Sequence, residues 1–215
     1  MKITVYSTKG SAWKTPIATN IALDREYAIW TNEPYHVFDG FIPAERLLSI
    51  DVNQPFPAIP KNIDIVFDLA WSISDTALSI TSAIEQSDVV LVPIYNQATS
   101  IKSGLNTIAE AMSLNKNIVV IATKLKKRGK RDQFKHWTDS EDYKNISNHV
   151  WSKFDEDIPV LPLKFSDIFD TIFEKEKSIA QLMDSWSLYK YTLRDVSEQF
   201  NDIYKLIDTY DAEEK

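Results

Sequence analysis

The chain has 215 residues, of which 44% are hydrophobic, and a formal net charge of −7, so it can bury a full core as one large domain and its surface as a whole does not attract nucleic acid. It has no cysteine, which excludes disulfide bridges and thiolate metal sites and fits a reducing compartment. No apolar run approaches the ~18 residues of a membrane span, and residues 1–5 have the pattern of a strand rather than of a signal peptide, so we expect a cytoplasmic protein.

Short β-rich runs alternate with helical patterns along the chain. The predicted strands are 2–6, 27–31, 64–68, 88–94, 117–123 and 160–163, and the predicted helices are 14–24, 75–86, 101–113 and the long stretch 132–154. The runs 89–92 and 118–121 are wholly apolar, which is typical of strands buried on both faces. The alternation therefore predicts an α/β fold, with a mostly parallel sheet flanked by helices on both faces in a Rossmann-like, three-layer arrangement.

Two regions are less regular. Residues 37–61 predict a short helix near 44–48 and an edge strand at 48–51. The aromatic residues expected to order this region are Phe38, Phe41 and Phe56.

The last region, 179–207, predicts one or two amphipathic helices. Their aromatic stripe is expected mainly in the core, and it consists of Trp186, Tyr189, Tyr191, Phe200 and Tyr204. An acidic tail, 208–215, follows. We expect a single domain over 1–215, whose C-terminal helical segment and tail occupy 180–215.

The loop between the first strand and the first helix carries the most informative chemistry, Ser-Thr-Lys-Gly-Ser-Ala-Trp-Lys-Thr over 7–15. A strand, a tight loop, Lys-Thr and a helix in this order are typical of a phosphate cradle, because the loop N–H groups and the helix N-terminus converge on an anion. In such a cradle Lys14 reaches the β- and γ-phosphates and the Thr15 hydroxyl binds Mg²⁺. The strict pattern G-x-x-x-x-G-K-[ST] is not met, since Trp13 precedes the lysine. An ordinary loop before a helix remains the alternative.

Asp68 ends the predicted strand 64–68, directly after apolar residues. A carboxylate at the tip of such a strand holds Mg²⁺ or its water shell in nucleotide-binding α/β folds. The alternative is an aspartate that caps the following turn.

The motif Lys9-Gly10-x-x-x-Lys14-Thr15 resembles the deviant Walker A motif, K-G-G-x-G-K-[TS], of the ParA/MinD family of partition and positioning ATPases, a SIMIBI-class group of P-loop NTPases. Further similarity to family motifs covers most of the chain up to about residue 179. The segments that carry it are 18–22, 63–70, 86–93, 117–123, which precedes the family's base-contacting loop, and 165–169.

This resemblance implies ATP and Mg²⁺ as cofactors. The residues implied to bind the nucleotide are Lys9, Gly10, Ser11, Ala12, Trp13, Lys14, Thr15, Pro16 and Thr123. The implied Mg²⁺ ligands are Thr15 and Asp68. The residues implied to take part in catalysis are Lys9, Lys14, Glu33 and Asp68. Lys9 corresponds to the lysine that crosses a dimer interface in this family. Glu33 aligns, through Pro34, with the second aspartate of the family's D-x-D-P, which implies that it positions water. The alternative is an exposed glutamate before a turn proline.

The resemblance also implies a homodimer formed on ATP, a ParB-like or adaptor protein as partner, and a role in plasmid or chromosome partition or other DNA segregation. We expect weak, Mg²⁺-dependent ATPase activity, because a tryptophan in the loop resists the backbone angles that glycine allows. Four departures, Ser11, Trp13, Thr31 and Ala70, favour a second hypothesis, a scaffold that binds proteins without ATP turnover. A third, a dethiobiotin-synthetase-like ligase, has no second-substrate motif to support it.

A basic run, 124–131, has six cations in eight residues. It is expected either to hold a DNA phosphate backbone or to be a solvated loop. The candidate DNA-binding residues are Lys126, Lys127, Arg128, Lys130 and Arg131.

Overall fold

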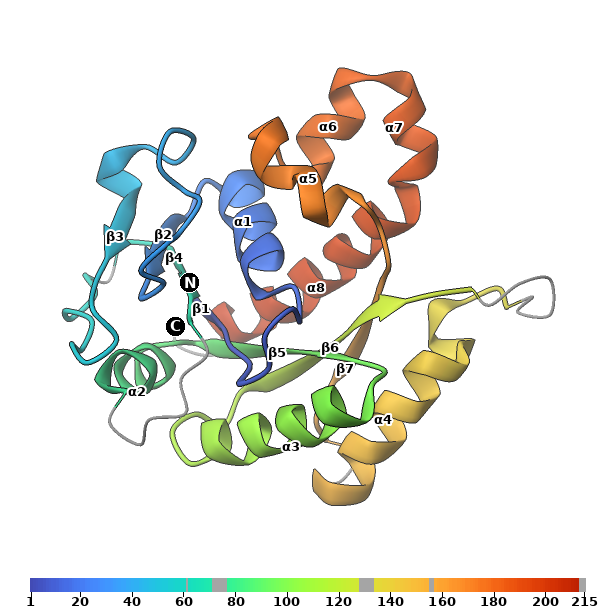
Figure 1. Cartoon of the computed structure of the whole chain (residues 1–215), viewed down its shortest axis with the longest axis horizontal. Coiled ribbons are helices and arrows are strands. Elements are labelled where there is room, and N and C mark those ends of the chain that lie inside the picture. The colour runs from blue at the N-terminus through green and yellow to red at the C-terminus, as the bar shows by residue number, and fades with distance from the viewer. Residues whose placement is uncertain (61, 71–76, 128–133, 155–156, 213–215) are drawn as a thin grey trace.

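The computed structural model describes residues 1–60, 62–70, 77–127, 134–154 and 157–212. Its centre is a seven-stranded sheet with the strand order β3-β2-β4-β1-β5-β6-β7, in which every pair of neighbouring strands is parallel (Figure 1). The strands are β1 (Lys2–Val5), β2 (Ala28–Thr31), β3 (Leu47–Ser49), β4 (Ile65–Asp68), β5 (Val89–Tyr95), β6 (Ile118–Leu125) and β7 (Val160–Lys164).

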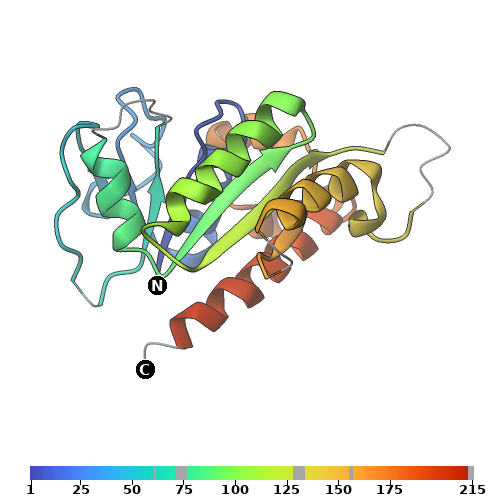
Figure 2. The same ribbon diagram turned by 90° about the horizontal axis from the view of Figure 1, so that it is seen from below.

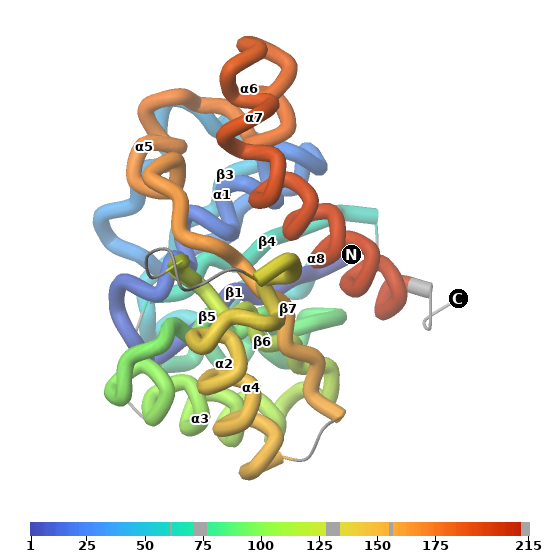
Figure 3. Tube along the Cα trace, turned by 90° about the vertical axis from the view of Figure 1, so that its right-hand side faces the viewer, coloured from blue at the N-terminus to red at the C-terminus, as the bar shows by residue number. Residues whose placement is uncertain are grey.

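The helices cover the two faces of this sheet. They are α1 (Lys14–Arg25), α2 (Leu78–Glu85), α3 (Ala98–Met112), α4 (Glu141–Phe154), α5 (Ile168–Lys175), α6 (Ile179–Ser185), α7 (Ser187–Thr192) and α8 (Arg194–Ala212). Figure 3 shows α1 and α5 to α7 on one side of the strands and α2 to α4 on the other. Among the described residues, none of the helices combines the length and the apolar character that crossing a bilayer requires.

Each face of the sheet has its own apolar cluster. Val89 and Leu91 of β5 face the cluster shared with α1, α5 and α8, whereas Val90 and Val92 face the cluster shared with α2, α3 and α4. Successive residues of a strand point to opposite faces, so a strand buried on both sides needs an uninterrupted apolar run. The predicted parallel sheet with helices on both faces is confirmed.

Two predicted helical regions differ from the structure. Helix α4 begins only at Glu141, because Trp137–Asp139 forms a 3₁₀ turn and the Ser140 hydroxyl accepts a hydrogen bond from the Tyr143 amide, as an N-cap does. The expected residues 132 and 133 of this helix lie outside the described residues.

The C-terminal region forms three helices, where one or two were predicted. Trp186 is extended, with φ −154°, and separates α6 from α7. The expected aromatic core is only partly present, since Phe200 and Tyr204 are buried whereas Trp186 and Tyr191 are 53% and 84% exposed.

Candidate functional site

The carboxyl ends of the strands share one edge of the sheet, and a cavity of about 530 Å³ opens there beside the loop that joins β1 to α1. The contiguous residues 10–16 line it. The other lining residues are Glu33, Lys124, Phe169, Asp170 and Phe173. In open parallel sheets this edge is where ligands bind, and the cavity volume lies within the usual range for small-molecule sites.

Two residues of this loop, Ser11 and Trp13, have a left-handed backbone, with φ 61° and φ 69°. This conformation costs a residue with a Cβ about 1–2 kcal/mol, and glycine is the residue that usually adopts it. At these two positions the loop thus has the backbone conformation that glycine usually adopts, although neither residue is glycine.

The indole of Trp13 explains how this backbone is held. It is 6% exposed, and its ring centroid lies 4.5 Å from that of Phe169 on α5 and 5.6 Å from that of Phe165 after β7. The ring packs inward and not toward the outside of the chain. It forms part of the cavity wall instead, and its burial offsets the backbone strain.

On its other side, the loop is tied to α3 through Thr8. The Thr8 amide donates to the Thr107 hydroxyl at 3.1 Å, and the Thr8 hydroxyl is 2.6 Å from that of Ser103. Lys9 follows directly; it is half-buried and does not line the cavity.

Lys14 and Asp68 supply the strongest electrostatic feature of the site. Lys14 is 7% exposed, and this burial lowers its pKa, while Asp68 and Glu33 act in the opposite direction. Asp68 is wholly buried, and desolvation raises the pKa of its carboxyl group to about 7, although Thr15 and Lys14 act to lower it and Glu33 adds to the increase.

Within the described part of the chain, neither oxygen of the Asp68 carboxylate has a hydrogen-bond partner that meets strict geometric criteria. The Thr15 hydroxyl is the nearest candidate, since it lowers the pKa of this carboxyl group as a hydrogen-bonding neighbour. A buried carboxylate without partners costs several kcal/mol, so its oxygens are ready to accept a cation. Because no group of three or more His, Asp or Glu among the described residues could hold a metal ion, a divalent ion here would need oxygen ligands from phosphate and water as well.

The residues at two further strand ends complete the edge. Thr123, near the end of β6, is buried, and its hydroxyl has no hydrogen-bond partner among the described residues. Asn32, after β2, accepts from the Ala70 amide at 2.6 Å and donates to the Ser79 hydroxyl at 2.7 Å. Asn32 therefore fixes the end of β2, which carries Glu33, to the segment that follows Asp68.

Sequence analysis missed three lining residues, Lys124, Asp170 and Phe173. Lys124 has φ 57°, and its Nζ lies 5.3 Å from the ring centroid of Trp13 and 5.1 Å from that of Tyr95. The sequence signal that could have identified Lys124 as a lining residue is its position directly after Thr123 on β6. Asp170 and Phe173 belong to α5, and no local sequence pattern indicates that this helix contacts the loop.

The predicted DNA-binding residues are only partly described. Lys126 and Lys127 are exposed, and their Nζ atoms lie 4.0 Å from the Phe165 ring centroid and 4.9 Å from that of Phe134. Arg128, Lys130 and Arg131 lie outside the described residues.

The seven-stranded parallel sheet with helices on both faces matches the fold of MinD/ParA P-loop NTPases. No family model and no curated protein sequence matches the chain, but solved structures do. A McdA–ATP complex from Cyanothece is 12% identical, with a TM-score of 0.60 over 94% of this chain and 96% of that one. The cell-division protein MinD from Aquifex aeolicus is 16% identical, with a TM-score of 0.59 over 93% and 96%.

A third similar structure is that of a protein assigned to plasmid partition, from Borrelia burgdorferi, bound to AMPPNP. It is 14% identical, with a TM-score of 0.55 over 94% of this chain and 98% of that one. At these identities the likeness establishes the shared fold.

We predict that Trp13→Gly destabilises the protein although it restores the usual residue of the motif. Loss of a buried tryptophan costs ~3–5 kcal/mol and relief of the left-handed backbone returns ~1–2 kcal/mol, so a net loss of about 2–3 kcal/mol is expected in urea unfolding. Ser11→Gly is the matched control, because Ser11 is exposed with a similar φ; its stability should stay equal or rise. Unchanged stability of Trp13→Gly would contradict this account of the loop.

We also predict a pH dependence set by Asp68. The unfolded carboxyl has a pKa of ~3.9 and the folded one about 7, so in this interval the native state holds a proton that the unfolded state has lost. The free energy of unfolding should therefore fall as pH rises from ~4 to ~7 and then level off. Asp68→Asn should remove this decrease and stabilise the ligand-free protein at pH 8 by ~1–4 kcal/mol. Identical pH profiles for the two proteins would show that Asp68 is not the group responsible.

Proposed function

We propose that the chain is a ParA/MinD-like ATPase that binds ATP with Mg²⁺ in the cavity beside residues 10–16. The observation that carries the proposal is the buried Asp68 carboxylate near Thr15 and Lys14, whose oxygens have no geometrically regular hydrogen bond to any described residue. An isolated structural aspartate would be expected to find hydrogen-bond partners in a folded protein. One left without partners beside a lysine and a phosphate-loop backbone fits a site completed by an ion and an anion.

Each proposed role follows from the position of the residue. The N–H groups at the start of α1 and in the loop would face the phosphates, and Lys14 would neutralise their charge at short range. Thr15 and Asp68 are the residues that would hold Mg²⁺, which neutralises charge on the β- and γ-phosphates when bound. Thr123, at the same edge, is proposed to contact the nucleotide.

Glu33 and Lys9 are proposed to complete the site for hydrolysis. Glu33 lines the cavity, so its carboxylate can accept a hydrogen bond from the attacking water and orient it. Lys9 does not line the cavity of its own chain, which fits a lysine that reaches the phosphates of a second copy in an ATP-bound homodimer. Hydrolysis would then remove the charge that holds the two copies together.

We propose a role in DNA segregation, with a ParB-like or adaptor protein as partner and non-specific DNA as a further ligand. Two similar structures are those of MinD and of a protein assigned to plasmid partition, which support a positioning or partition role. For DNA the support is the pair of exposed lysines, Lys126 and Lys127.

A second candidate is the scaffold without ATP turnover. It is favoured by the loop itself, since the packing of Trp13 against Phe165 and Phe169 holds the backbone without any ligand. The two candidates differ in one measurable property, which is saturable binding of Mg-ATP.

We therefore predict saturable heat when Mg-ATP is titrated into the wild-type protein, and at least ~10-fold weaker binding for Lys14→Ala, because a buried cation at the phosphates is worth more than ~1.4 kcal/mol. Lys116→Ala, an exposed lysine at the opposite edge of the sheet, should bind as the wild type does. Light scattering of the same samples reports the dimer, which should form with Mg-ATP and be lost in Lys9→Ala. Absence of heat in the wild type would favour the scaffold.

DNA binding is tested separately. Replacing Lys126, Lys127, Arg128, Lys130 and Arg131 together by Gln should weaken retention of duplex DNA and reduce the magnitude of the slope of log K against log [salt] by up to ~4.5, since each lost phosphate contact contributes ~0.9. Retention and slope equal to those of the wild type would exclude these residues as the DNA contact.

A further inference from the structure

A second cavity, of about 510 Å³, lies between α3 and α4, on the face of the sheet opposite α1. These two helices lie side by side in Figure 2, and each leads from one parallel strand to the next, so they run in the same direction. Helix α3 packs close to the sheet at Gly104, where a side chain would not fit: a Cβ at this position would lie only 2.4 Å from Ile94 Cδ1. The cavity is therefore a groove along two helices.

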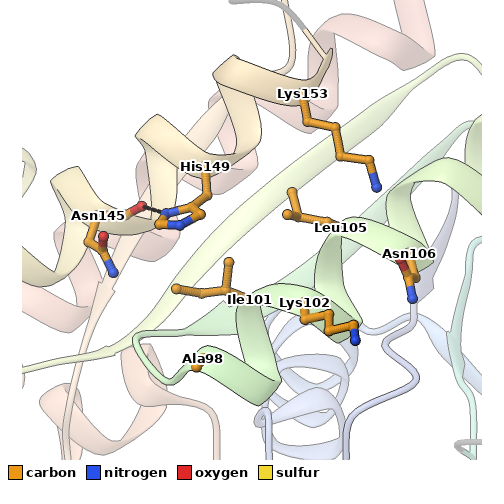
Figure 4. Close-up of a pocket in the computed structure, with 8 residues that line it drawn as sticks. All are labelled: Ala98, Ile101, Lys102, Leu105, Asn106, Asn145, His149 and Lys153. Atoms are coloured by element: carbon orange, nitrogen blue, oxygen red, sulfur yellow. Dashed lines mark hydrogen bonds between the residues drawn. The ribbon is translucent and has the colours of Figure 1, made fainter.

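The groove has an apolar floor and cationic edges (Figure 4). Ile101 and Leu105 of α3 form the floor, with Lys102 beside them on the same helix. Along α4, Asn145, His149 and Lys153 follow one another at intervals of four residues, and residues so spaced share one face of a helix.

The charges of the groove differ from those of the chain. None of its described lining residues is acidic, although the chain has a net charge of −7. Lys102 and Lys153 are exposed and form no ion pair within the described part of the chain. His149 Nδ1 is 2.7 Å from the Asn145 carbonyl oxygen, to which it donates, so Nε2 is left for a ligand.

From this pattern we infer that the groove is a docking site for an acidic amphipathic helix of a partner protein. The apolar row of the groove, flanked by cations, is complementary to a partner helix that carries an apolar stripe flanked by carboxylates. Binding of such a helix in a groove is a common mode of peptide recognition. The lining residues of α3, from Ala98 to Asn106, span ~12 Å of helix axis, enough for two turns of such a partner. The lining residues come from two neighbouring helices, which is the arrangement that receives a third helix.

Helix α3 also connects the groove with the nucleotide site. Lys102 and Leu105 line the groove, whereas Ser103 and Thr107 on another face of the same helix bond Thr8 of the phosphate loop. The site lies apart from the cavity beside residues 10–16, and docking requires no nucleotide.

The probe is a fluorescein-labelled peptide of ~15 residues, the length at which an isolated helix becomes marginally stable, with leucines at helical spacing and glutamates beside them. We expect saturable, salt-sensitive anisotropy with the nucleotide-free protein, and at least ~10-fold weaker binding to the double variant Lys102→Glu and Lys153→Glu. Lys144→Glu, an exposed lysine on α4 outside the groove, is the matched control and should bind as the wild type does. A scrambled peptide of equal composition should not bind.

The position of the bound peptide has its own readout. The chain has no cysteine, so Asn106→Cys places a single fluorophore at the groove, and its emission should change on peptide binding. No saturable binding to the wild type, equal binding of the scrambled peptide, equal binding by the double variant, or an unresponsive fluorophore would each overturn the inference. Because nucleotide is absent throughout, failure of ATP binding leaves the result standing.

Discussion

The packing of Trp13 against Phe169 is the interaction on which the candidate site depends. The loop between β1 and α1 has two left-handed residues, Ser11 and Trp13, and neither is glycine. Burial of the indole, at a ring distance of 4.5 Å from Phe169, stabilises this backbone from outside the loop. The lining residues Phe169, Asp170 and Phe173 all belong to α5, so the same contact also closes one side of the cavity.

The second constraint is electrostatic. Asp68 stands at the end of a central strand, wholly buried and with no regular hydrogen bond to the residues that the structure describes, next to a lysine that is itself buried. Such an arrangement is unfavourable for the empty protein. Stability is commonly given up in this way at functional sites, and here the unfavourable charge and the cavity occur at the same edge of the sheet.

The sheet and the loop could be predicted from local patterns. Continuous apolar runs such as 118–121 marked strands buried on both faces, and the pattern around residues 14 and 15 pointed to the loop beside which the cavity opens. The patterns did not reveal the orientation of Trp13, the part of Lys124 in the cavity or the bridge made by Asn32, because each depends on contacts between segments far apart in the chain. The start of α4 was missed although Ser140, its N-cap, is followed by Glu141 and Asp142, which is a pattern typical of a helix N-terminus.

The left-handed tryptophan has a consequence for recognising nucleotide sites. Sequence motifs for nucleotide-binding loops identify a tight turn by the small residues within that turn. In this chain the residues that form the turn and the residues that stabilise it lie far apart in the sequence. Residues 11 and 13 adopt the left-handed backbone, and two phenylalanines more than a hundred positions downstream pack against Trp13. Substitutions of Phe165 or Phe169 would thus alter the backbone of the loop although neither residue belongs to it, and a search for glycines passes over any protein that builds its turn this way.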